Sequence, residues 1–265
     1  MESRRMCPSC RAFVSTADRV CPYCEAEIGP RAVSRRPDIG GTIAGFIPQA
    51  RFTTAMILFV NMALLLASSL TEAGRALSMA GAMYGPVVFR MGEWWRPITA
   101  GFFHGDVFHI MMNSWALFDL GAQVEELYGT HKLIFFYFVS TIGGFLLSGV
   151  WSNHPSVGSS AGIFGLIGVM IALGVHDRSS LGEQIRGMYT RWAVFGLVMS
   201  VLPGIDMAAH LGGLAAGFGA SYLAGFPSAF VDRRDTLWRV AAGICLAITL
   251  LAFGRMFLKF LAISS

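Results

Sequence analysis

Long blocks of apolar residues, separated by short polar stretches, follow one another from position 52 to the end of the chain. A block of about 20 predominantly apolar residues has the length that a helix needs to cross a lipid bilayer. Seven blocks come close to this length, at roughly 52–70, 107–127, 132–151, 160–176, 190–203, 206–225 and 237–258. The fifth is short and the sixth is rich in glycine, so the pattern defines their bounds less well than their existence. It predicts an all-α polytopic membrane protein.

The composition agrees with this prediction and adds an orientation. Hydrophobic residues make up 54% of the 265 residues and charged residues 14%, whereas soluble domains carry about 25% charged residues. Positions 1–49 contain no apolar core like that of a signal peptide, so we expect the N-terminus to stay in the cytosol. With that orientation, 15 of the 20 lysines and arginines fall in cytosolic segments, in accord with the positive-inside rule. Arg255 and Lys259, at the outer end of the last block, run against it.

We therefore expect a multi-pass integral membrane protein with a cytosolic N-terminus, in a bacterial inner (plasma) membrane. Membrane lipid is then the medium that surrounds most of the chain. The formal net charge of +4 reflects this orientation, and no nucleic-acid partner is expected.

Four of the five cysteines form two C-x2-C pairs near the N-terminus, Cys7 with Cys10 and Cys21 with Cys24. Four thiolates complete a tetrahedral zinc shell, and paired short knuckles supply them in zinc ribbons. A segment this short, with almost no apolar core, could hardly fold without the metal. The competing interpretation is a redox pair, but no βαβ pattern surrounds it. The fifth cysteine, in the last apolar block, is expected to be a buried packing residue.

The domain organisation follows from these two regions. Residues 1–28 are expected to form a small cytosolic zinc-ribbon-like domain in which zinc is structural. Glycine and proline punctuate residues 29–51 too often for a long helix, so this stretch is expected to be a linker. Residues 52–225 would form the membrane core, and 226–265 a loop and an additional C-terminal transmembrane helix. Whether the head binds an unknown cytosolic partner or senses metal stays open.

Polar residues interrupt three of the apolar blocks, and such residues are costly in lipid, so each is a functional candidate. The second block contains His109 and Asn113, with His104 just before it, the fourth opens with Ser160, and the sixth carries His210. All three blocks run from outside to inside, and the polar residues lie near their starts. At about 1.5 Å rise per residue, the side chains lie at similar depths. His109 and Asn113 are four apart and share a helix face.

Each residue taken alone also fits an ordinary structural role. A serine in a transmembrane helix usually bonds its own i−4 carbonyl, and His210 alone fits a satisfied bundle histidine or a proton relay. Asp206, one turn earlier, fits a helix cap better than a catalytic acid. The glycines after His210 fit small-residue packing, which would also bring the sixth block close to the fourth. These separate roles do not explain why all three polar clusters share one depth.

The combination of a serine and a histidine at one depth suggests nucleophilic catalysis. A serine hydroxyl becomes a strong nucleophile when a base takes its proton, and histidine suits that task at neutral pH. The oxyanion that develops needs preformed donors. The backbone N–H of Ser160 and the side chains of His109 and Asn113 would supply them.

In four motifs the sequence resembles the rhomboid family. They are Trp95-Arg96, His104-x4-His109-x3-Asn113, Gly158-Ser159-Ser160, and A-H-x-x-G-x-x-x-G from Ala209 to Gly217. The resemblance covers roughly 52–225 and implies a six-helix core followed here by a seventh helix. It implies an intramembrane serine endopeptidase that needs no cofactor and cleaves transmembrane segments of single-pass or polytopic proteins near the outer leaflet.

The resemblance also implies residue roles. Ser160 would be the nucleophile and His210 the base, with His109 and Asn113 as the oxyanion hole. Phe164 would pack on the catalytic imidazole, with Gly158 and His104 in supporting positions, and 71–103 would form an outer loop lying partly in the membrane. The chain departs from the family pattern at Ala161, where glycine is usual, and at Phe164, where tyrosine is common.

Two other functions compete with proteolysis. A non-catalytic rhomboid-like protein would bind client transmembrane helices, although such proteins typically lack the nucleophile or the histidine. A transporter or channel with a histidine relay would need inverted repeats and polar groups through the full membrane depth, whereas the polar groups here gather at one side.

Overall fold

The structure is a computed structural model that describes residues 4–7, 9–10, 12–15, 18–27, 52–227 and 234–264. The chain divides into a small N-terminal unit and a larger helical unit, which are considered separately below. The expected linker at 29–51 lies outside the described residues.

The small unit is a cysteine-centred turn structure. Strands β1 (Arg4–Met6) and β2 (Phe13–Ser15) form an antiparallel pair. One turn follows Cys7 and a similar turn follows Cys21. Cys7 N–H closes the first by donating to Ala12 O, and Cys21 N–H closes the second by donating to Ala26 O, both at 2.9 Å. Among the described residues of this unit, the buried hydrophobic cluster consists of Cys7, Val14 and Cys21. So small a core agrees with a fold that depends on metal.

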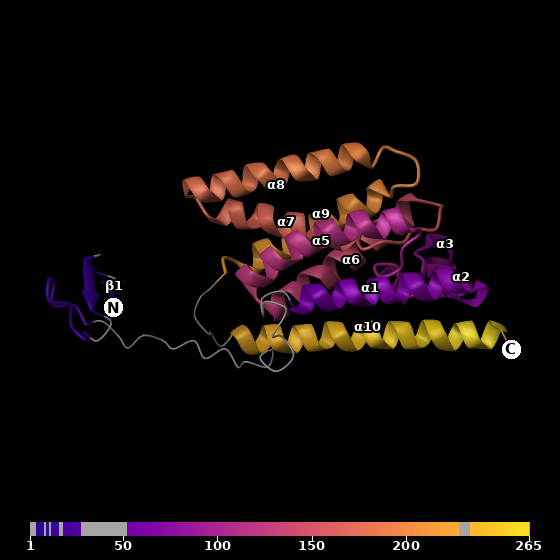
Figure 1. The fold of residues 1–265 in the computed structure, drawn as a ribbon, viewed down its shortest axis with the longest axis horizontal. Coiled ribbons are helices and arrows are strands. Elements are labelled where there is room, and N and C mark those ends of the chain that lie inside the picture. Colours follow the sequence, from indigo (N-terminus) through magenta and orange to yellow (C-terminus); the bar gives the residue numbers. More distant parts are fainter. Residues whose placement is uncertain are drawn as a thin grey trace. The chain divides into compact units, whose positions relative to one another are not determined.

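In the described part of the helical unit, seven long helices make up most of the chain and confirm the seven apolar blocks (Figure 1). They are α1 (Phe52–Leu70), α5 (Val107–Tyr128), α6 (Thr130–Trp151), α7 (Ser160–His176), α8 (Ser180–Met199), α9 (Met207–Ala224) and α10 (Arg234–Ser264). By length and composition, three described segments are long and apolar enough to cross a membrane: Phe52–Leu70, Thr130–Trp151 and Asp235–Ala262. Many large apolar side chains are exposed on the bundle, as expected of a surface that faces lipid.

The fifth helix differs from its expected bounds of 190–203. It begins ten residues earlier, where the Ser179 side chain accepts a hydrogen bond from Gly182 N–H at 3.2 Å and caps the helix. Glu183, Arg186 and other polar residues in its first half lower the hydropathy there. The helix ends at Met199, with Ser200 as its C-cap. Hydropathy therefore located only the apolar half of this element.

Three short helices occupy the expected outer loop at 71–103: α2 (Glu72–Gly81), α3 (Gly85–Met91) and α4 (Arg96–Thr99). Arg96 ties them together, because its guanidinium donates to the Met79 and Ala82 carbonyl oxygens at 2.8 and 2.7 Å. The same guanidinium forms an ion pair with Glu93, with N and O 2.6 Å apart. The W-R motif thus has a structural role here.

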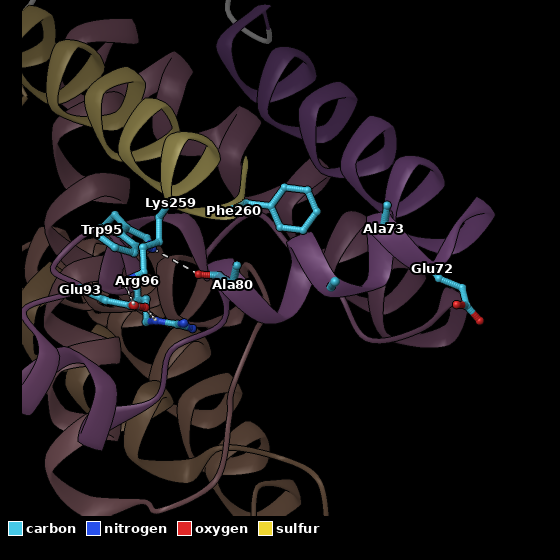
Figure 2. Close-up of a pocket in the computed structure, with 9 residues that line it drawn as sticks. Glu72, Ala73, Ala80, Glu93, Trp95, Arg96, Lys259 and Phe260 are labelled. Atoms are coloured by element: carbon cyan, nitrogen blue, oxygen red, sulfur yellow. Dashed lines mark hydrogen bonds and ion pairs between the residues drawn. The ribbon is translucent and has the colours of Figure 1, made fainter. Parts of the chain in front are cut away.

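Helix α10 packs against α6, α4 and α2. Figure 2 shows Lys259 and Phe260 of α10 beside the segment that carries Glu93, Trp95 and Arg96. The Lys259 ammonium lies 3.8 Å from the Glu93 carboxylate. Lys259, whose position disagreed with the positive-inside rule, therefore has an acidic partner in the loop. These residues border a pocket of about 440 Å³ between α2 and α10, which contains none of the predicted site residues.

A glycine-lined contact between α7 and α9 forms the centre of the bundle. A Cβ atom built on Gly213 would lie 2.1 Å from the Ala161 carbonyl oxygen, and one on Gly217 would lie 2.1 Å from that of Gly165. Both partners advance by four residues, so the two helices run in the same direction. The small-residue packing expected after His210 is confirmed for Gly213 and Gly217.

Candidate active site

Ser160 is the first residue of α7 and follows a loop that is fixed at both sides. Met83 and Ser156 exchange backbone hydrogen bonds of 2.8 and 2.9 Å, and Gly158 N–H donates to Ala100 O at 2.9 Å. Gly158 has a φ of +133°, which residues with a side chain rarely adopt. The loop thus presents the serine and its backbone N–H at a helix N-terminus, where the helix dipole favours negative charge.

His210 lies in the first turn of α9, which Asp206 caps. The Asp206 carboxylate accepts from Ala209 N–H at 2.9 Å and also bonds the Ser148 hydroxyl of α6. This confirms Asp206 as a helix cap. The cap and the contact with α6 set the start of α9, and with it the place of the imidazole.

Phe164 stacks on His210, with ring centroids 4.0 Å apart and planes 12° from parallel. Phe164 is four residues after Ser160, so the two side chains share one face of α7. The imidazole therefore lies one helical turn from the serine, beside the close contact of Gly213 with Ala161. No hydrogen bond joins Ser160 to His210 among the described residues. Such bonds are often long before substrate binds.

His109 and Asn113 converge on the loop before Ser160. A Cβ atom on Gly158 would lie 2.7 Å from His109 Nε2 and 3.4 Å from Asn113 Nδ2, so the two side-chain nitrogens approach this glycine closely. Asn113 Nδ2 is buried and has no hydrogen-bond partner in the described part of the chain. A buried donor without an acceptor is costly, and it is the arrangement expected of a site that awaits an oxyanion.

His104 contacts the loop at a different point. Its Nε2 lies 3.2 Å from the Ser159 hydroxyl and 3.4 Å from the Ser159 backbone nitrogen, and its ring meets His109 edge-on with centroids 5.1 Å apart. His104 therefore positions the residue before the serine. This agrees with a supporting role.

Ser200 was missed by the sequence analysis. Its hydroxyl oxygen lies 2.6 Å from His210 Nδ1. The expected bounds of the fifth block, 190–203, placed Ser200 inside a helix, whereas it is the C-cap of α8.

The four N-terminal cysteines form a candidate metal site. Their sulfur atoms all lie within 4.8 Å of one another, with Cys7 and Cys24 3.7 Å apart and Cys10 and Cys21 3.6 Å apart. A tetrahedral site with Zn–S bonds of about 2.3 Å has sulfur–sulfur edges of about 3.8 Å, so the residues fit zinc. Both of these contacts join different knuckles, so the four sulfur atoms gather as one cluster and not as two separate C-x-x-C pairs.

Comparison with known families identifies the helical unit. Residues 91–227, about half of the chain, match the model of the rhomboid domain. The matched segment contains Ser160, His210, His109 and Asn113.

Several curated proteins are similar to this chain. The rhomboid protease GluP of Bacillus subtilis (strain 168) is 33% identical over 167 residues, which cover 62% of this chain and 32% of GluP. Rhomboid-like protease 1 of Toxoplasma gondii is 35% identical over 161 residues, 58% of this chain and 55% of that protein. The putative rhomboid protease YdcA of Bacillus subtilis (strain 168) is 33% identical over 137 residues, 50% of this chain and 68% of YdcA. The chain thus spans about a third of GluP and about half of the Toxoplasma protein.

Proposed function

The chain belongs to the rhomboid family, and we propose that it is an intramembrane serine endopeptidase in which Ser160 and His210 form the catalytic dyad. The observation that carries the proposal is the stack of His210 on Phe164, one helical turn from Ser160. The unpartnered amide of Asn113 beside the same loop supports it. The dyad, the oxyanion hole and the substrate class are all parts of this proposal.

The proposed mechanism uses only groups of this chain. The Ser160 oxygen attacks the scissile carbonyl carbon while His210 takes the serine proton. The oxyanion accepts hydrogen bonds from Asn113, His109 and the Ser160 N–H. The C–N bond then breaks as His210 gives the proton to the leaving amine. A water attacks the acyl-enzyme through the same base and releases Ser160.

The substrates proposed are transmembrane segments of single-pass or polytopic proteins, cut near the outer leaflet. His109, Ser160 and His210 all occur in the first turn of their helices, α5, α7 and α9. With the N-terminus in the cytosol, as the distribution of arginine and lysine favours, these helix starts lie at the outer side. The surrounding membrane is proposed to be a bacterial inner membrane.

For the chain as a whole we propose a head at 1–28 with a structural zinc, a linker, a protease core at 52–225 and a seventh helix within 226–265. Zinc would be held by the four cysteines of the N-terminal unit, which fit it by spacing. Catalysis itself needs no metal in this scheme. The head has a geometry suited to holding a metal and offers a surface to an unidentified cytosolic partner.

The proposal is tested by cleavage of a single-pass reporter in proteoliposomes. Ser160→Ala and His210→Ala should each lower the cleavage rate by at least about 10³-fold, because each removes a member of the catalytic unit. Both variants should keep the wild-type helical circular dichroism. Cleavage by Ser160→Ala at the wild-type rate would refute the assignment.

Among the described residues no hydrogen bond joins Ser160 to His210, and the alternative compatible with this geometry is a non-catalytic rhomboid-like protein that binds client helices. A fluorophosphonate probe separates the two functions, since it reacts only with an activated serine. Labelling of wild type that is lost in Ser160→Ala supports the protease. A folded wild type that retains a client helix and never labels supports the alternative.

A further inference from the structure

Two short contacts connect the proposed base to the end of α8. The Ser200 hydroxyl oxygen lies 2.6 Å from His210 Nδ1 and 2.7 Å from the Gly196 carbonyl oxygen. Both side chains are buried, with Ser200 4% and His210 6% exposed. The contacts are therefore shielded from water, and each polar atom depends on its protein partner.

The direction of these hydrogen bonds follows from what each group can donate. A carbonyl oxygen only accepts, and a serine hydroxyl has one proton and two lone pairs. Ser200 therefore gives its proton to Gly196 O and accepts the proton of His210 Nδ1. The reverse arrangement would place two oxygen lone pairs against each other at 2.7 Å. The network thus selects the tautomer in which Nδ1 is protonated and Nε2 carries the free lone pair.

The same end of α8 also holds the ring that stacks on the imidazole. A Cβ atom on Gly196 would lie 2.5 Å from Phe164 Cζ, so Phe164 packs against the backbone of α8 on one side and His210 stacks on its ring. Gly196 thus accepts the hydrogen bond of the Ser200 hydroxyl with its carbonyl oxygen. Because Gly196 has no side chain, it also leaves room for the Phe164 ring. One helix end controls both the tautomer and the tilt of the imidazole.

We propose that Ser200 is a positioning residue for catalysis and takes the place that a carboxylate occupies in a serine–histidine–aspartate triad. This inference rests on the proposed function. In this hydrogen-bond series, His210 Nδ1–H donates to the Ser200 oxygen and the Ser200 O–H donates to the Gly196 carbonyl oxygen. The series directs Nε2 of His210 toward the proton of Ser160. During attack the imidazole becomes cationic, and the Nδ1–H bond to Ser200 strengthens as the positive charge develops. A neutral hydroxyl does this without a buried carboxylate, which is expensive within a membrane.

The carboxylate closest in sequence does not serve this purpose. Asp206 bonds Ala209 N–H and the Ser148 hydroxyl, so its oxygens are used at the helix cap. The base therefore depends on Ser200 for its orientation.

The first test is a set of variants assayed on the reporter. Ser200→Ala should lower kcat by roughly 10-fold or more, because it removes one hydrogen bond that becomes stronger in the transition state. KM should stay within about twofold of the wild-type value. Ser200→Thr keeps the hydroxyl and should restore most of kcat. Ser140→Ala is the matched control, because it removes a buried serine hydroxyl of α6 that has no partner among the described residues, and its kcat should match wild type.

The second test reads the tautomer directly and does not require activity. Nitrogen-15 spectra of histidine-labelled protein, with His210→Ala to assign the signal, should show His210 in wild type with Nδ1 protonated. The signal should change in Ser200→Ala and remain in Ser200→Thr. If wild type shows the Nε2–H tautomer, or if folded Ser200→Ala keeps both wild-type kcat and the wild-type signal, the proposal is wrong. An inactive wild type with the Nδ1–H tautomer would instead contradict the proposed function and leave the Ser200 contact standing.

Discussion

The side-chain amide of Asn113 is buried, and its nitrogen has no acceptor within the described residues. The contribution of this amide to catalysis can therefore be tested separately from its contribution to protein stability, because replacing Asn113 breaks no hydrogen bond donated by that nitrogen. The second proposed oxyanion donor, His109, lies one turn earlier on the same face of α5.

We predict that Asn113→Ala lowers kcat for reporter cleavage by about 10²-fold, the typical effect of removing one oxyanion donor. KM should change little, because the donor acts mainly on the charge that develops in the transition state. Asn113→Asp, nearly the same shape but an acceptor when ionised, should be at least as impaired. Met112→Ala, an exposed neighbour on α5, is the control and should behave as wild type.

At the residue level, the common depth of three apolar blocks grouped Ser160, His210, His109 and Asn113 as candidates, and the resemblance to the rhomboid family added Phe164. The stack of Phe164 on His210 appears in the structure as expected. Ser200 could not be predicted. Its contact with Nδ1 depends on where α8 ends and on how the following turn returns to α9, and neither is encoded in local hydropathy.

The contact between α7 and α9 is the packing that most directly sets the site. It places backbone against backbone at Gly213 and Gly217, so its tolerance for added volume is small. Any separation of the two helices would move His210 relative to Ser160.

We predict that Gly217→Ala lowers the melting temperature in detergent by several degrees, because the added methyl would lie 2.1 Å from the Gly165 carbonyl oxygen and overpacking of this kind typically costs about 1–3 kcal/mol. Cleavage should fall as well. Gly219→Ala, two residues later on α9, meets no atom within 4 Å. It should melt at or slightly above the wild-type temperature, since alanine favours helix over glycine. Equal melting of the two variants would show that the contact is looser than described.

At the level of elements, apolar blocks predicted the existence of all seven long helices, since block length and lipid thickness are physically linked. They misplaced α8, whose first half is polar, and gave no account of Lys259 near the C-terminal end of α10. The ion pair with Glu93 explains that lysine. A partner so distant in the sequence cannot be predicted from periodicity.

The whole molecule joins a small cysteine-centred unit to a membrane unit. The head has its own buried cluster and its own candidate metal ligands. Its cysteine spacing predicted a four-sulfur cluster correctly, because the spacing of knuckles is tied to the geometry of tetrahedral coordination. Its partner could not be predicted, since nothing in the motif specifies one.

We predict one zinc per chain in the purified, reduced protein, measured by inductively coupled plasma mass spectrometry. Cys7→Ala and Cys21→Ala should each lose the metal, and cleavage of a purified reporter should stay near the wild-type rate, because the metal takes no part in the proposed mechanism. Cys245→Ala removes the buried cysteine of α10 and should retain full zinc. Zinc retained by Cys7→Ala at the wild-type ratio would exclude the four-cysteine site.

The proposed reacting groups all occur at the starts of α5, α7 and α9. If these helix starts lie at one depth in the bilayer, a protease of the proposed kind would cut at a fixed distance from the membrane surface. A substrate would be cut where its chain crosses that level. Changing the thickness of the lipid would shift the cut along the substrate without any change in either sequence.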